Sequence, residues 1–383
     1  MKKISVFLPV MVCALLLNGC SWFDKSKVKE LPPIQVTPEI NVQKVWQTSV
    51  GNGTDKQYLV LTPKLADGRL YVDDFKGDVM ALNPQNGSVI WKTRIPSPIT
   101  SAPAVGQQKV VVGTGDAQAY ALDANTGKVL WQAKVPNEVL AAPGIAPGLA
   151  LIKTIDGQVI ALDINTGKEV WSYGLTLPTL ILRGGSTPVS TGQFVVVGFA
   201  NGKLAVLSAA NGNMAWQRAI ATSQGLSAIQ QMVDIDADPI VANGVVYVAT
   251  YQGSLTALNL QSGQVLWQHD MSAYAGMALR SGSLFVTDAG GHVWAFNPQS
   301  GQVQWRQNRL AERQITGPGL SGNELVIGDD QGNLYWLSQQ DGHLMAKQVA
   351  DAKVPFYAPP VGNGNVAYAI NAKGKLYAYA VPK

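Results

Sequence analysis

A seven-residue pattern close to Gly-x-x-x-Ala-Leu-Asn/Asp recurs along this chain of 383 residues and constrains its fold more than any other feature. Its eight copies are GDVMALN (77–83), AQAYALD (117–123), GQVIALD (157–163), GKLAVLS (202–208), GSLTALN (253–259), GHVWAFN (291–297), GNLYWLS (332–338) and GKLYAYA (374–380). They begin 40, 40, 45, 51, 38, 41 and 42 residues apart, and a period near 40 is that of one four-stranded propeller blade. The sequence therefore predicts an all-β fold, an eight-bladed β-propeller of four-stranded antiparallel blades, over residues 42–383.

Each repeat carries the same local signals in the same order. A proline opens most of them and indicates an inner strand with a free edge, because proline has no N–H for a sheet ladder. A turn such as DANTG (123–127) follows the third strand, and its Gly is expected in the left-handed conformation. The fourth strand then presents a tryptophan, which we interpret as packing between blades. These tryptophans are Trp91, Trp131, Trp171, Trp216, Trp267 and Trp305.

The last two repeats depart from this order. The seventh has Ala346 at the tryptophan position, and the eighth ends at AYAVPK (378–383) without a fourth strand. The upstream segment NVQKVWQTSV (41–50) carries Trp46 but has no hairpin before it. We therefore expect this segment to supply the missing strand, which closes the ring and removes the sheet edges at the seam.

The N-terminal segment predicts export and lipidation. In residues 1–19, Lys2 and Lys3 precede an apolar run that is too short for a comfortable membrane span, as in a signal peptide. The segment Leu17-Asn18-Gly19-Cys20 resembles the lipobox of bacterial lipoproteins, which implies acylation of Cys20 and, with Ser21 next, an outer-membrane address facing the periplasm. The alternative is an ordinary cleavage site with an incidental cysteine. Residues 20–41, with three prolines, are predicted to form an extended tether.

Charge and cysteine content exclude several classes of protein. Loss of Lys2 and Lys3 with the signal lowers the formal charge from +4 by two, far from the basic stripe that nucleic-acid binding needs. Loss of Cys13 leaves Cys20 as the one cysteine of the mature chain, so no internal disulfide is expected. Only 14% of residues are charged while Gly numbers 39, which suits a turn-rich β protein stabilised by sheet packing.

The repeat also resembles that of pyrroloquinoline-quinone dehydrogenases, which raises the question of catalysis. Those enzymes need calcium ligands, a catalytic carboxylate and often a vicinal cysteine pair, and no such pair exists here. His269, His292 and His343 occupy different positions in different repeats and match no zinc spacing. The run DIDAD (234–238) is similar to the opening of a calcium loop, but Pro239 follows it and the distal Glu is missing, so a solvated or partner-facing acidic loop is the competing interpretation. We expect no catalytic residue, metal or cofactor.

Two spacings, of 45 and 51 residues, mark insertions in the repeat. Trp91 to Pro103 spans 12 residues, whereas Trp171 to Pro188 spans 17 and Trp216 to Pro239 spans 23. Both insertions therefore lie in connections between blades, and all such connections emerge on one face of a propeller. The first contains an aliphatic run with one arginine and the second ends in carboxylates, which suits a protein-docking patch. Internal packing of the leucines is the alternative.

The lipobox, the tether, the eight repeats and the runs LILRG (180–184) and DIDADP (234–239) together resemble the BamB family of outer-membrane assembly factors over the full chain. The resemblance implies a non-enzymatic lipoprotein of the β-barrel assembly machinery whose inter-blade loops bind the periplasmic POTRA domains of BamA. By motif position, the contacts are Leu180, Leu182, Arg183, Asp234 and Asp236. Other components of the machinery and nascent β-barrel chains are further implied partners.

Two rival functions remain open at this point. One is a periplasmic quinoprotein-type oxidoreductase, on the strength of the shared repeat. The other is a carbohydrate- or peptidoglycan-binding propeller that uses channel aromatics such as Tyr71 or Tyr251.

Overall fold

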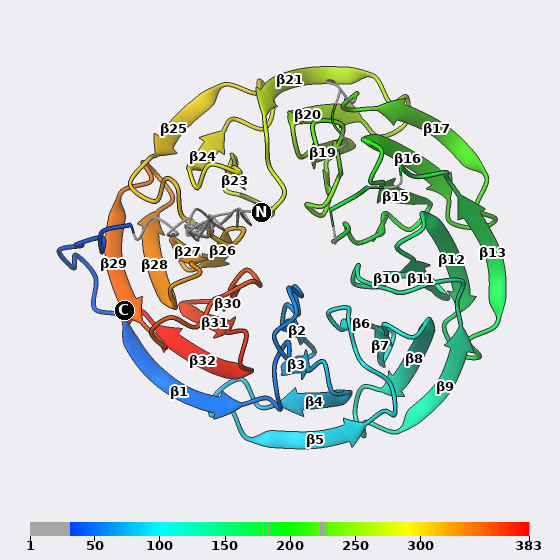
Figure 1. Cartoon of the computed structure of the whole chain (residues 1–383), viewed down its shortest axis with the longest axis horizontal. Helices are drawn as coiled ribbons and strands as arrows, with labels where there is room; N and C mark the ends of the chain where they lie inside the picture. Colours follow the sequence, from blue (N-terminus) through cyan, green and yellow to red (C-terminus); the bar gives the residue numbers. More distant parts are fainter. Residues whose placement is uncertain (1–30, 179, 183, 223–226, 228, 383) are drawn as a thin grey trace, which may run out of the picture. The chain divides into compact units, whose positions relative to one another are not determined.

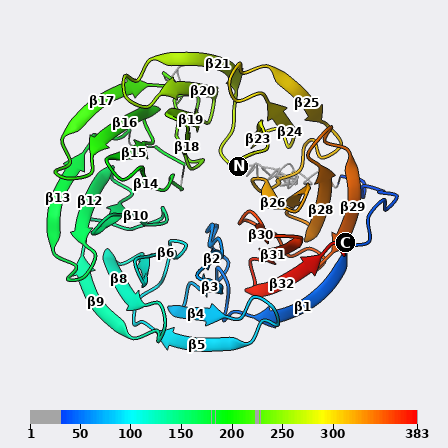
Figure 2. The same ribbon diagram turned by 180° about the vertical axis from the view of Figure 1, so that it is seen from behind.

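The described residues of the chain form eight four-stranded antiparallel sheets arranged around a central axis (Figures 1 and 2). The structure is a computed structural model, and it describes residues 31–178, 180–182, 184–222, 227 and 229–382. Each sheet runs from an inner strand at the axis to an outer strand at the rim, in sequence order in seven of the sheets, while in the eighth the outer strand is β1. The predicted eight-bladed β-propeller is therefore confirmed.

The first four blades follow one another along the chain. Blade one contains β2 (Lys64–Ala66), β3 (Arg69–Asp73), β4 (Asp78–Leu82) and β5 (Val89–Arg94). Blade two contains β6 (Ala104–Gly106), β7 (Lys109–Gly113), β8 (Gln118–Asp123) and β9 (Val129–Lys134). Blade three contains β10 (Gly144–Ala146), β11 (Leu149–Lys153), β12 (Gln158–Asp163) and β13 (Glu169–Gly174). Blade four contains β14 (Val189–Ser190), β15 (Phe194–Gly198), β16 (Lys203–Ser208) and β17 (Met214–Ala219).

The remaining blades complete the ring. Blade five contains β18 (Ile240–Ala242), β19 (Val245–Ala249), β20 (Gly253–Asn259) and β21 (Val265–Met271). Blade six contains β22 (Met277–Arg280), β23 (Ser283–Thr287), β24 (Val293–Phe296) and β25 (Val303–Gln307). Blade seven contains β26 (Gly319–Ser321), β27 (Glu324–Gly328), β28 (Asn333–Ser338) and β29 (Leu344–Val349). Blade eight contains β30 (Val361–Asn363), β31 (Val366–Ile370), β32 (Lys375–Ala380) and, from the start of the chain, β1 (Gln43–Ser49).

The seam of the ring is the pairing of β1 with β32. The two strands are antiparallel, from Gln43 opposite Ala380 to Ser49 opposite Lys375, with one irregularity after Lys44. The predicted closure by the N-terminal segment is thus confirmed. β1 therefore covers the outer edge of β32, as the fourth strand covers the third strand in the other blades.

The prolines that open the repeats precede the inner strands. Pro63, Pro103, Pro143 and Pro188 each stand one residue before the first residue of β2, β6, β10 and β14. An N–H is not required of the residue just outside a ladder, so proline fits there without loss of a hydrogen bond. These prolines line a cavity on the axis, as the sequence predicted for the inner strands.

The tryptophans of the outer strands join seven of the eight blades to the next blade. Seven of them donate an indole N–H to a backbone carbonyl of the following blade, at 2.7–3.1 Å. They belong to Trp46, Trp91, Trp131, Trp171, Trp216, Trp267 and Trp305. Each ring also packs on the turn glycine of that blade, so the predicted structural role of the tryptophans is confirmed.

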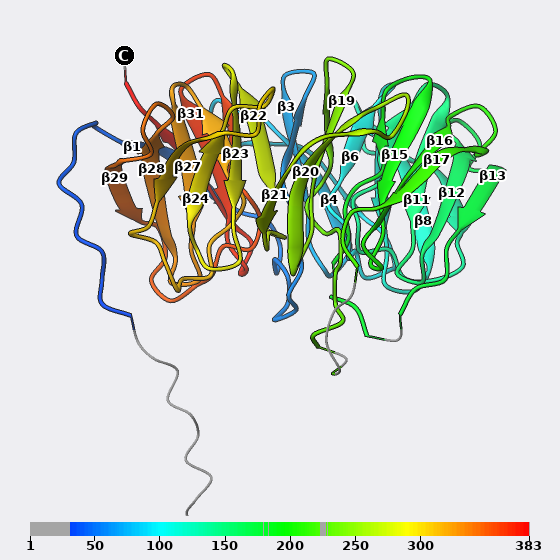
Figure 3. The same ribbon diagram turned by 90° about the horizontal axis from the view of Figure 1, so that it is seen from above.

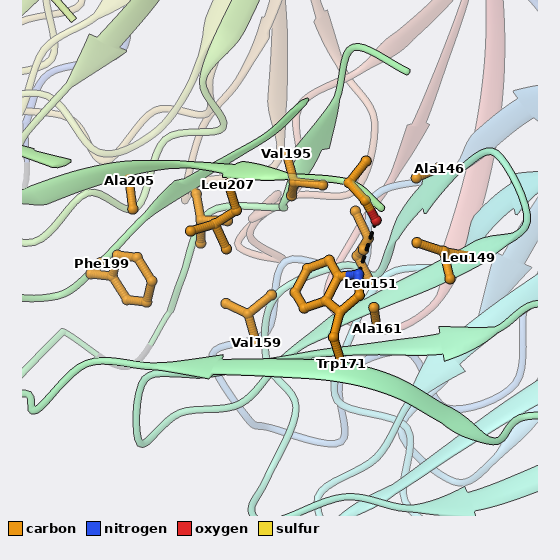
Figure 4. Packing of buried hydrophobic residues seen from close by; sticks show 12 residues of the cluster. Ala146, Leu149, Leu151, Val159, Ala161, Trp171, Val195, Phe199, Ala205 and Leu207 are labelled. Atoms are coloured by element: carbon orange, nitrogen blue, oxygen red, sulfur yellow. Dashed lines mark hydrogen bonds between the residues drawn. The ribbon is translucent and has the colours of Figure 1, made fainter. Parts of the chain in front are cut away.

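Blades three and four illustrate this lock (Figure 4). Trp171 donates to the carbonyl of Ala209 at 2.9 Å, and its ring covers Gly212, where an added Cβ would lie 2.6 Å from the indole. Gly212 has a φ of +72°, so the left-handed turn and the close approach of the ring both require glycine. Aliphatic side chains of the central strands, including Leu151 and Val195, fill the space behind the ring.

Blade seven replaces the outer tryptophan with one on its third strand. Ala346 pairs with Trp336 across β28 and β29, and Trp336 is almost fully buried. Its ring meets Tyr379 of blade eight edge-on at 5.7 Å. The junction between blades seven and eight is therefore also filled by an aromatic pair, from different strands.

The chain joins the ring before its first strand. Residues from Ile34 onwards belong to the same compact unit as the blades, and the contact boundary falls at Pro33. Ile34 and Val36 pack on the apolar cluster of blades six and seven, and the N–H of Glu39 donates to the carbonyl of Met345 on β29 at 2.8 Å. Residues 34–41 thus contact blade seven, within the range predicted as a tether. The predicted signal segment and Cys20 lie outside the described residues.

Candidate functional site

The two insertions project together from one face of the ring (Figure 3). They are the β13–β14 connection, residues 175–188, and the β17–β18 connection, residues 220–239, and we call them the long connections. Figure 3 shows that the described parts of both lie on the same face of the ring. The predicted placement of the insertions on a common face, flanking blade four, is confirmed.

Carboxylates of the second long connection hold the first. The N–H of Leu182 donates to Asp234 Oδ2 at 2.5 Å, and the N–H of Thr187 donates to Asp238 Oδ1 at 2.6 Å. The second connection is itself held at Ile235, whose N–H donates to the carbonyl of Phe199 in blade four at 3.2 Å. The two segments therefore form one bonded surface. The predicted contact residue Arg183 lies outside the described residues.

The aliphatic residues of the first long connection divide into two groups. Leu175 and Leu177 are half-buried against the core of blades three and four. Leu180 is 42% exposed, while Ile181 and Leu182 are half-buried at the same surface. The leucines near β13 therefore pack internally, whereas Leu180 is exposed, and the docking interpretation stays a prediction.

Asp234 lies beneath the patch. Its side chain is fully buried, and its Oδ1 has no hydrogen-bond partner among the described residues. Burial raises the pKa of Asp234 to about 6, although the N–H of Leu182 and the nearby Lys153 both favour the ionised form. This carboxylate positions Leu182 and does not reach the surface itself.

Asp236 and Lys153 complete the charged group under the long connections. Burial, and next the charge of Asp234, raise the pKa of Asp236 to about 7. Lys153, on β11, is also buried, and its Nζ donates to the carbonyl of Gly198 at 2.8 Å and to Ser186 Oγ at 3.4 Å. Burial lowers the pKa of Lys153 to about 8, against the opposing effect of Asp236 and its neighbours. The surface thus rests on charges that are poorly solvated and sensitive to pH.

A cavity of about 970 Å³ opens beside the long connections on the axis of the ring. Asp236 and Asp238 line it together with Leu182 and Thr187, so the patch and the cavity share residues. Tyr58, Tyr251, Tyr274 and Tyr357 also line it. Three of these tyrosines lie in connections between blades, where the repeat has no fixed pattern, and no sequence signal distinguished Tyr58, Tyr274 and Tyr357 as site residues.

One predicted channel aromatic is misplaced. Tyr71 is buried between blades one and two, where its hydroxyl donates to the carbonyl of Ala124 at 3.2 Å. The reason is that side chains on the second strand of a blade point alternately to the two neighbouring blades, while the inner strand and the connections line the axis. Tyr251, in contrast, does line the cavity.

The histidines are dispersed over the ring. His269 packs on Phe296 in the junction of blades five and six, His292 bonds Asp288, and His343 lies between Asp341 and Glu39 at the rim. In the part of the chain that the structure describes, no three His, Cys, Asp or Glu side chains are grouped as a metal site would require. The same residues contain no helix with the length and hydropathy needed to cross a membrane.

Comparison with known proteins decides the family. The model of the family described as outer membrane protein assembly factor BamB matches residues 41–116, 76–307 and 289–382. The chain belongs to the BamB family. The BamB protein of Legionella pneumophila (strain Paris) is 41% identical over 376 residues, which cover 96% of this chain and 97% of that protein. Its Salmonella typhimurium counterpart is 34% identical, with 99% of each chain covered.

Solved structures agree with the BamB assignment. The crystal structure of BamB from Moraxella catarrhalis has a TM-score of 0.79 and 26% identity, and the match covers 89% of this chain and all of that one. Quinohemoprotein alcohol dehydrogenase from Comamonas testosteroni has a TM-score of 0.68 at 15% identity, which shows a shared fold alone. The resemblance to quinoproteins in the repeat is thus a property of the propeller, and the BamB family is one of outer-membrane protein assembly factors.

Proposed function

We propose that this chain is a non-enzymatic lipoprotein scaffold of the outer membrane that binds the POTRA domains of BamA and assists the assembly and insertion of β-barrel proteins. The names of its relatives support the assembly role. The observation that carries the proposal is the bonded surface of the two long connections, since the repeat itself explains only the scaffold.

The proposed contact surface consists of Leu180, Leu182, Arg183 and Asp236. Leu180 offers an exposed aliphatic anchor of the kind that is desolvated at the centre of an interface. Asp236 lines the adjoining cavity together with Leu182, and its carboxyl group is proposed to fix the orientation of a partner. Asp234 acts indirectly, because its carboxylate holds the backbone of Leu182 in place.

The proposed anchor is a lipid on Cys20, with the ring on the periplasmic side of the outer membrane. Nascent β-barrel chains and other components of the machinery are proposed as further partners. Labelling of growing cells with radioactive palmitate tests the anchor. The wild-type chain is expected to carry the label, and a Cys20→Ser variant is expected to lose both the label and sedimentation with outer membranes.

Co-purification from solubilised membranes tests the docking surface. Leu180→Asp, Leu182→Asp and Arg183→Glu are each expected to reduce the recovery of BamA with the tagged chain. Leu130→Asp is the matched control, because Leu130 on the outer strand β9 is 43% exposed, close to the 42% of Leu180. Recovery of BamA at the wild-type level by all three surface variants would reject this docking site.

A further inference from the structure

The mouth of the axial cavity contains an aromatic group that the repeat does not explain. Tyr58 comes from the β1–β2 connection, Tyr251 from the β19–β20 connection, Tyr274 from the β21–β22 connection and Tyr357 from the β29–β30 connection. The rings of Tyr58 and Tyr357 are 4.7 Å apart, and those of Tyr251 and Tyr274 meet edge-on at 5.9 Å. Four tyrosines that are distant in the sequence therefore converge on one cavity.

These rings are not part of the packed core. Tyr58 is 50% exposed and the other three are half-buried, unlike the structural Tyr71 and Tyr377, which are fully buried between blades. Within the described residues, the hydroxyls of the four tyrosines make no hydrogen bond, whereas the hydroxyl of Tyr71 bonds the backbone. The hydroxyls and the exposed parts of these rings therefore face the cavity.

The same mouth is acidic. Among the residues that the structure describes, Asp236, Asp238 and Asp330 line the cavity, and Lys64 is the one cation beside them. Asp236 is close enough to Tyr58 that its charge, after burial and Tyr274, contributes to a pKa of Tyr58 raised to about 12. Lys153 lies behind Gly185, where its Nζ is bonded to Gly198 and Ser186. That ammonium is therefore engaged within the fold, and the cavity presents tyrosine faces and carboxylates to its contents.

Tyrosine faces beside carboxylates suit one chemical class of ligand. A cation over an aromatic face is attracted by the ring quadrupole. A guanidinium fits better than an ammonium, because it is planar, stacks on aromatic rings and can give two parallel hydrogen bonds to one carboxylate. We propose that the tyrosine cage, formed by Tyr58, Tyr251, Tyr274 and Tyr357 with Asp236 and Asp238, binds an arginine side chain of a partner protein docked on the long connections.

The inference rests on the proposed function for the source of the arginine, because Asp236 belongs to both the cage and the proposed contact surface, and Asp238 bonds Thr187 of the first long connection. The charge of the cavity argues for this occupant over a neutral sugar. Binding of a glycan chain is the alternative result, so the test uses one probe for the arginine side chain and another for the glycan.

The test is a titration of the purified full-length protein carrying carbon-13-labelled tyrosine, with the ring signals followed by NMR. The probes are argininamide, citrullinamide, which is its neutral isostere, and a chitin oligosaccharide. Argininamide is expected to shift the signals of the cage tyrosines and to bind at least about tenfold more tightly than citrullinamide. Tyr58→Leu and Asp238→Asn are expected to weaken argininamide binding, and Tyr173→Leu, outside the cavity on β13, is expected to leave it unchanged.

Three results overturn the cage. They are equal affinity for argininamide and citrullinamide, argininamide binding that survives Tyr58→Leu, and shifts caused by the oligosaccharide alone. Co-purification of BamA separates this proposal from the docking proposal. Argininamide binding without recovery of BamA would reject the docking surface and retain the cage. Absence of argininamide binding, together with BamA recovery that is unaffected by Tyr357→Leu, would reject the cage and retain the docking surface.

Discussion

Blade four is held to its neighbours in two regions that differ in chemistry. At the rim, the indole of Trp171 covers Gly212 and donates to Ala209, in a contact that is apolar and is repeated around the ring. At the face of the long connections, Leu182 contacts Asp234 and Thr187 contacts Asp238. These contacts lie above a charged group that the other blades do not repeat in the described residues. The first region contains no titratable group, so it stabilises the ring at any pH. The second region is less stabilising because it buries charged groups, but it gives the face a defined, charged surface.

Truncation of a rim tryptophan is expected to give the largest effect. Trp171→Ala removes a buried indole and its hydrogen bond, so the free energy of unfolding should fall by about 3–5 kcal/mol. Chemical denaturation followed by circular dichroism measures it. Trp171→Phe, which keeps most of the apolar area, should lose clearly less, and equal stability of the alanine variant and the wild type would contradict the role of the rim.

The turn glycines separate two causes of destabilisation. Gly212→Ala places a Cβ 2.6 Å from the Trp171 ring at a φ of +72°, whereas Gly192→Ala, in the same blade at a φ of +87°, meets no heavy atom within 4 Å. Gly192→Ala should therefore cost only the left-handed conformation, about 1 kcal/mol, and Gly212→Ala should cost clearly more. Thermal melting of both variants measures the difference, and equal losses would show that the ring contact contributes nothing.

The face of the long connections should be sensitive to pH where the rim is not. The pKa of Asp236 is raised from 3.8 to about 7, so the folded state binds this proton more tightly than the unfolded chain. Its contribution is fully present below pH 3.8 and is lost as the pH rises through about 7. The contribution of Asp234 is likewise lost as the pH rises through about 6. The pKa of Lys153 is lowered from 10.5 to about 8, so this residue makes stability rise again above pH 8.

Asp236→Asn tests this sign. Between about pH 4 and pH 7 the wild type should lose more thermal stability than the variant, because the variant has no proton to release at this position. Trp171→Phe is the control from the rim, and its melting temperature should follow the wild-type pH dependence. A steeper loss in Asp236→Asn than in the wild type would contradict the raised pKa.

The smallest effect on stability is expected at the exposed part of the patch. Leu180→Asp should change the free energy of unfolding by no more than about 0.5 kcal/mol, since its side chain is exposed. Denaturation of this variant beside the matched Leu130→Asp measures it. A loss as large as that of a core residue would mean that Leu180 serves the fold, and any reduced recovery of BamA would then have a structural cause.

Several features of this molecule follow from the repeat and can be predicted residue by residue. The positions of the turn glycines, the rim tryptophans and the closing strand around Trp46 are local patterns that recur, so each copy supports the others. The location of the long connections follows from the same comparison of spacings. Leu182 and Asp234 are in contact and Asp236 lines the adjoining cavity, but Asp234 is buried beneath the surface, and Arg183 and Cys20 lie outside the described residues.

What the sequence by itself determined is therefore the ring and the place where it is interrupted, because periodicity and turn chemistry act over a few residues. Only the tertiary structure decided which side chains of irregular segments meet. It buried Asp234, placed Tyr71 between blades and brought Tyr58 to Tyr357 from opposite ends of the chain. The physical reason is that closing the ring fixes the distances between connections, and those distances depend on the stacking of all eight blades rather than on any local pattern.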